Sequence, residues 1–168
     1  MAFIDNSDEF IRKMNHACKQ ALTSVGMHAV SNTKRNLTEG IPRNESGTAT
    51  GALRNSITSE VQMSEQCVII GSGLKYAIYN EYGTGVYADG GIGKQGYWVY
   101  VPGGGGKTGT AKVYTEEKAR QIVAILKSKG VDAHMTKGIT ALHFLKKAIE
   151  DHRKEYVDTI KECLEKAK

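Results

Sequence analysis

Two glycine-rich patterns come closest to motifs that bind nucleotides. Residues 103–108 read Gly-Gly-Gly-Gly-Lys-Thr, like a loop that cradles phosphates. That loop needs a glycine five residues before Gly106, where the chain has Val101, and a helix directly after its threonine. Residues 91–96 match a dinucleotide fingerprint but precede a predicted strand instead of following one. Because both patterns lack the context that gives them a mechanism, we predict no cofactor.

The other reactive residue types are equally uninformative about catalysis. The five histidines show no HExxH or other paired ligand spacing, and no serine lies in a nucleophile elbow. Cys18, Cys67 and Cys163 are odd in number and far apart, which favours free thiols over a metal site or a redox motif. We therefore predict a protein without catalytic residues or bound metal, and not an enzyme.

Length and composition fit a single domain spanning residues 1–168. The chain is 40% hydrophobic and 24% charged, as in ordinary globular proteins. No run approaches the roughly 20 apolar residues that cross a bilayer, and the amino terminus lacks the features of a secretory signal. We expect synthesis in the cytoplasm and no membrane association. The net charge of +5 lies mostly in residues 111–168, which permits contact with nucleic acid without predicting it.

A long helix is predicted at the amino-terminal end of the chain. Its pattern runs to about residue 37, and an interruption near Gly26 is left open. The apolar residues recur at steps of three and four, which gives a stripe that packs on a sheet or another helix. This stripe consists of Phe10, Met14, Ala17, Ala21 and Val25.

The remaining elements alternate between strands and helices. Residues 57–63 and 67–71 have the alternation of an antiparallel hairpin, and residues 97–102 have the content of a further strand. Thr115 is expected to cap a helix that Gly130 ends, inside a segment, 113–136, that has the features of an insertion. A final helix is predicted from about Thr140 to the end. The fold class is therefore α+β, with long glycine-rich loops between residues 83 and 112.

The segment around residues 75–84 carries three tyrosines at every third position. Tyr76, Tyr79 and Tyr82 are expected along one side of a short helix that Gly83 stops. Two interpretations remain open at this point. The tyrosines either close off the core, or they form an assembly surface, where tyrosine is a favoured residue.

Three pieces of sequence together resemble a known family. They are Thr-Gly-Ala-Leu-Arg-Asn-Ser at 50–56, Ile-Ile-Gly-Ser at 69–72 leading to Glu-Tyr-Gly-Thr at 81–84, and His-Phe-Leu-Lys-Lys-Ala at 143–148. In this order the chain resembles the tailed-bacteriophage neck family typified by gene product ten of HK-ninety-seven-like siphophages, the head–tail joining or tail-completion proteins. The family usually has a proline before the last helix, and this chain has none there.

The resemblance implies two helices packed on an antiparallel sheet and a structural role in the virion. It implies a ring, with six copies expected, that joins the tail to the capsid and contacts neighbouring connector and tail proteins. Such a ring has head-to-tail contacts between unlike faces of adjacent subunits. Two lysines, Lys112 and Lys137, are candidates for contact with DNA that passes through the ring. The residues expected at or beside the contact between subunits are Tyr76, Tyr79, Glu81, Tyr82, Thr84 and Trp98.

A stand-alone nucleic-acid-binding protein is the alternative from a different class. It would use the basic carboxy-terminal third of the chain. Against it, Trp98 and the tyrosines are not interleaved with Lys or Arg, as a platform for stacking bases requires.

Overall fold

The computed structural model describes residues 6–40, 51–102 and 112–166, which form two compact units. The first unit comprises the described residues up to Ala77 together with those from His143 onward, and the second comprises residues 78–142. The division of the chain into one or more domains stays a prediction.

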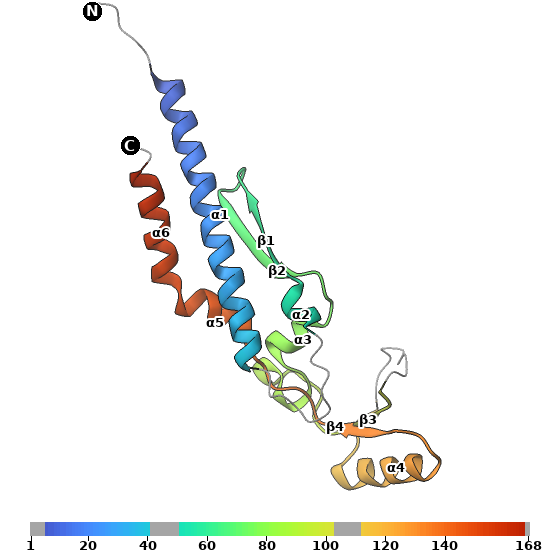
Figure 1. Ribbon diagram of the computed structural model, residues 1–168. Coiled ribbons are helices and arrows are strands. Elements are labelled where there is room, and N and C mark those ends of the chain that lie inside the picture. Colours follow the sequence, from blue (N-terminus) through green and yellow to red (C-terminus); the bar gives the residue numbers. More distant parts are fainter. Residues whose placement is uncertain (1–5, 41–50, 103–111, 167–168) are drawn as a thin grey trace, which may run out of the picture. The chain divides into compact units, whose positions relative to one another are not determined.

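The first unit is organised around one helix, α1 (Ser7–Gly40), shown in blue in Figure 1. Its 34 residues give a length of about 50 Å. The helix continues through Gly26, and the neighbouring strands explain this glycine. A Cβ atom there would lie 2.9 Å from Ser59 Oγ and 3.0 Å from Val68 Cγ2. Gly26 therefore lets a strand pair approach the helix backbone closely.

That strand pair is the predicted hairpin, and its pairing is confirmed. The short helix α2 (Ala52–Asn55) leads into β1 (Ile57–Gln62), which pairs antiparallel with β2 (Cys67–Ser72). The register runs without a break from Ile57 opposite Ser72 to Gln62 opposite Cys67. Val68 and Ile70 pack against buried Val25 and Ala29 of α1, as alternation along a half-buried strand requires.

The carboxy-terminal end of the chain forms two helices instead of the predicted one. α5 (Phe144–Asp151) and α6 (Arg153–Glu165) both contact α1. The chain bends between α5 and α6 (Figure 1). His152, the residue between the two helices, has φ −108° and ψ 12°. The predicted start near Thr140 is wrong because His143 has φ 51°, a left-handed conformation that no helix interior accepts.

A buried chain of hydrogen bonds ties these helices to α1. The Asn32 amide donates to the Tyr156 hydroxyl (3.0 Å), and that hydroxyl donates to the Ala148 carbonyl of α5 (2.8 Å). Asn36 Nδ2 donates to the Phe144 carbonyl at 3.2 Å. Asn32 is 4% exposed and Tyr156 is 7% exposed, so these groups find their partners inside the protein instead of in water.

The second unit contains the other small sheet. α3 (Ala77–Tyr82) leads into it, followed by two short 3-10 helices, η1 (Gly85–Tyr87) and η2 (Asp89–Gly91). β3 (Trp98–Tyr100) pairs antiparallel with β4 (His134–Thr136), and α4 (Glu116–Ser128) lies between these strands in sequence.

The predicted boundaries of α4 and the α+β class are confirmed. Thr115 Oγ1 accepts a hydrogen bond from the Lys118 amide at 3.4 Å, and Gly130 has φ 77°. Before α4 the chain forms an isolated β-bridge, Tyr97 opposite Tyr114. None of the described helices is both long and apolar enough to cross a membrane.

Replacing Tyr156 by Phe tests the buried hydrogen bonds of the first unit. The change leaves the Asn32 amide without its acceptor, and we expect a loss of about 1–3 kcal/mol in the free energy of unfolding. Urea denaturation measures this loss. Tyr79→Phe is the control, because Tyr79 is 53% exposed and should change stability little. Equal stability of the wild type and Tyr156→Phe would contradict this role.

The same pair of proteins gives a test with pH. Burial raises the pKa of Tyr156, so the folded state favours the neutral phenol. The contribution of the neutral Tyr156 phenol to the free energy of unfolding is fully present below the pKa of about 10 that tyrosine has in the unfolded chain. It is lost as the pH rises through the higher pKa of the folded state. The stability difference between wild type and Tyr156→Phe should therefore shrink above that pH, and a difference that stays constant would contradict the assignment.

Candidate assembly surface around α3

The tyrosines of α3 are on the surface. Tyr79 and Tyr82 are each 53% exposed, and Ile78 beside them is 56% exposed. Tyr76, which directly precedes α3, is 42% exposed. Of the two interpretations left open by the sequence, the one in which these rings close off the core does not fit this exposure. Large apolar groups on a short exposed helix are instead typical of contact surfaces.

Two of the predicted contact residues face inward instead. Glu81 is only 4% exposed. Thr84 is half-buried and bonded twice to one residue: its amide donates to the Ile139 carbonyl (2.9 Å), and its hydroxyl accepts from the Ile139 amide (3.0 Å). The two bonds to Ile139 fix the chain directly after α3. Contact of Glu81 and Thr84 with another chain stays a prediction.

The backbone after α3 lies directly against the chain around residue 138. Val86 N donates to the Lys137 carbonyl at 2.9 Å. A Cβ atom at Gly85 would lie 2.0 Å from that carbonyl oxygen, and one at Gly138 would lie 1.9 Å from the Thr84 oxygen. The sequence indicated that glycine ends α3, but only the fold shows that backbone meets backbone here. No side chain fits into this contact, so the backbone directly after α3 is fixed against residues 137–139.

A second group of polar contacts lies on the same unit and was missed by sequence reasoning. The Lys137 ammonium lies 5.3 Å from the centre of the Tyr87 ring, and its hydrogen bond to Tyr87 raises the pKa of Lys137. The Tyr97 hydroxyl donates to Glu116 Oε2 at 3.0 Å, and Arg120 binds the other oxygen at 2.5 Å.

These contacts also change how readily the groups ionise. The hydrogen bond from Tyr97, followed by that from Arg120, lowers the pKa of Glu116, and the same bond raises the pKa of Tyr97. The helix spacing of Glu116 and Arg120 is the one signal in the sequence that could have predicted part of this group.

The other predicted site residues are distributed over the second unit. Trp98 is half-buried in β3, opposite Thr136. Lys112 is exposed and lies two residues before the Tyr97–Tyr114 bridge. Lys137 is half-buried and engaged by Tyr87. No contact joins Trp98 to the α3 tyrosines in the described hydrogen-bond and ring contacts, and DNA contact by the two lysines stays a prediction.

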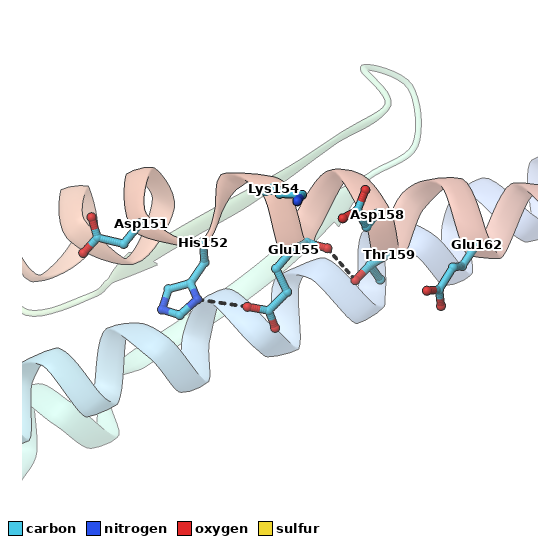
Figure 2. A pocket seen from close by; sticks show the side chains of 7 residues that line it. All are labelled: Asp151, His152, Lys154, Glu155, Asp158, Thr159 and Glu162. Carbon is cyan, nitrogen blue, oxygen red and sulfur yellow. Dashed lines mark hydrogen bonds and ion pairs between the residues drawn. The ribbon is translucent and has the colours of Figure 1, made fainter.

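A shallow acidic groove of about 480 Å³ lies along α6 in the first unit (Figure 2). Glu155 is held there by His152 Nδ1 at 2.9 Å and approaches His28 Nδ1 of α1 at 3.5 Å. The described residues contain no group of three His, Cys, Asp or Glu arranged to hold a metal ion. The groove is lined by Asp151, His152, Lys154, Glu155, Asp158, Thr159 and Glu162.

The structure describes one of the two glycine patterns, and that one differs from a nucleotide site. The first, at 103–108, lies outside the described residues. In the second, a Cβ atom at Gly93 would lie 1.9 Å from the Gly85 oxygen, so this glycine serves chain packing. The strand β3 follows it where a dinucleotide site has a helix.

Replacing Gly85 by Ala tests the backbone contact beneath α3. Gly90→Ala is the matched control, because Gly90 has a similar φ of 69° but no atom within 4 Å of its would-be Cβ. The control should lose only about 1–2 kcal/mol of stability for its left-handed backbone. Gly85→Ala should lose more, since it also meets the Lys137 carbonyl. Thermal unfolding measures both, and equal losses would contradict the close contact.

Part of the chain matches a known protein family. Residues 2–83, which include α1, α2, the hairpin and α3, match the family described as "Bacteriophage HK97-gp10, putative tail-component". No curated protein matches the chain, and no solved structure does. The match ends at Gly83, directly after the tyrosine-rich helix whose residues carried the resemblance. Over residues 2–83 the chain is therefore similar to this family of phage tail components.

Proposed function

We propose that this protein is a ring-forming subunit of the phage head–tail junction, where it joins the tail to the capsid. The family supports a structural role in the phage tail. The ring of six copies and the position at the junction are our proposals. In this role the protein works through surfaces that recognise other virion chains and carries out no reaction of its own.

The observation that carries the proposal is the exposed apolar surface of α3. Ile78, Tyr79 and Tyr82 each expose more than half of their surface. Tyrosine offers a large contact area and loses little conformational entropy when it is buried between chains. The chain directly after α3 is fixed by glycine contacts that exclude side chains. A rigid platform of this kind lowers the entropic cost of binding.

The proposed partner of this surface is a different face of the next copy in the ring. Head-to-tail contacts join unlike faces, so the tyrosines of one subunit need not meet those of the next. Lys112 and Lys137 are proposed to approach DNA inside the ring, with weak contacts that salt screens. Neighbouring connector and tail proteins are the other proposed partners.

The double variant Tyr79→Ala, Tyr82→Ala tests the proposal. Removing two aromatic anchors from an interface should prevent assembly, because such anchors carry most of the binding energy. We expect the number of infectious, tail-bearing particles to fall by at least about tenfold. Plaque counts and electron microscopy of particles measure this.

Tyr100→Ala is the matched control. Tyr100 is 45% exposed on β3 of the same unit, and its replacement removes the same ring. This control should assemble normally. Unfolding curves show whether each variant is folded. Normal yields of infectious particles from a folded double variant would overturn the role of α3.

A further inference from the structure

The β1–β2 hairpin of the first unit leaves both of its edges unpaired within the described residues. The two strands form a complete two-stranded sheet. Apart from Gln66 N to Met63 O inside the turn, no backbone hydrogen bond beyond the β1–β2 ladder involves residues 57–72 of these strands and their turn. In an antiparallel pair, alternate residues of each strand direct their N–H and C=O groups away from the partner. Each edge therefore offers about three residues that can pair with a further strand.

These edges lack the features that normally prevent strand addition. Natural edge strands are protected by lysine, by proline or by bulges. β1 and β2 contain no proline and no lysine or arginine, and Glu60 is their one charged residue. The register runs through six consecutive pairs, so no bulge twists either edge away. Ile69, on the face opposite the α1 contact, is 50% exposed.

We propose that the hairpin edges form a further contact between copies of this chain, in addition to the one proposed for α3, with β2 of one copy pairing with β1 of the next. This inference deepens the proposed ring and rests on it. The two open edges lie on opposite sides of one hairpin, so pairing β2 with a neighbour's β1 leaves a free edge at each end. Every copy can then repeat the contact until the ring closes, which removes all free edges.

Symmetry fixes the direction of this pairing. Rotation about a ring axis that lies roughly along the strands keeps each strand's direction from copy to copy. Because β1 and β2 are antiparallel within one copy, β2 is also antiparallel to the neighbour's β1. The hairpins then form one continuous antiparallel sheet, with α1 covering one face of each hairpin.

The charge pattern favours this partner edge over the alternatives. Pairing β1 with β1 of a second copy brings two Glu60 carboxylates onto neighbouring strands, which is unfavourable. Pairing β2 with β2 avoids this repulsion but forms a closed dimer whose β1 edges stay open. In the proposed contact, Glu60 of one copy instead lies beside β2, which carries no charge.

The test uses the full chain and the variant Ile69→Lys, with Ile125→Lys as control. Both isoleucines are about half-exposed, at 50% and 55%, and Ile125 lies on α4, outside the hairpin. Lysine on an edge strand opposes strand addition. We expect Ile69→Lys to weaken self-association by at least about tenfold in sedimentation at up to millimolar concentration. Ile125→Lys should associate like the wild type, and thermal unfolding verifies that both are folded.

Hydrogen exchange reads the backbone contact directly. On association, the outward amides of residues 57–62 and 67–72, about half of the total, should change from fast to slow exchange. Association without this protection, or equal association of Ile69→Lys and wild type, would overturn the edge pairing. So would a wild-type chain that stays monomeric throughout. Incorporation of the chain into particles, measured separately, tests the proposed function and does not depend on either result.

Discussion

Close approach to α1 is the constraint on which the first unit depends. The helix face toward its neighbours carries small residues, among them Ala17, Ala21, Gly26 and Ala29, all of them buried. Small side chains let the hairpin and the α5–α6 pair lie near the helix backbone, where many weak dispersion contacts add up. The Asn32–Tyr156 hydrogen bond then fixes the position of α6 along α1, because a shift along the helix would leave buried polar groups without partners.

Close approach of backbone to backbone also holds the loops of the second unit together. Glycines at 83, 85 and 138 bring two chain segments together with no side chain between them. Glycine destabilises the interior of helices and strands, but here it occupies positions where a side chain would not fit. The result is a small helix whose large apolar side chains, Ile78, Tyr79 and Tyr82, face solvent while the carboxylate residue Glu81 is buried. Such an inverted distribution is costly for an isolated molecule and favours the proposed contact with other chains.

Sequence reasoning succeeded where local patterns decide structure. The apolar stripe of α1, the alternation of the hairpin and the Thr115 cap each predicted the observed element. It failed where tertiary contacts decide. The break at His152 has no proline or glycine to signal it, and the left-handed backbone of His143 is visible only in the fold. Thr84 belonged to the family motif, yet its hydroxyl is used inside the unit, because a motif does not say which way a side chain points.

The account rests on one claim, that this protein acts by binding copies of itself and other virion chains. Electron cryomicroscopy of purified particles tests it most directly. The account predicts density for this chain as a closed ring between capsid and tail, with α3 covered by an adjacent protein. Particles that are complete and infectious but contain no copy of the chain, or a ring in which α3 faces only solvent, would contradict it.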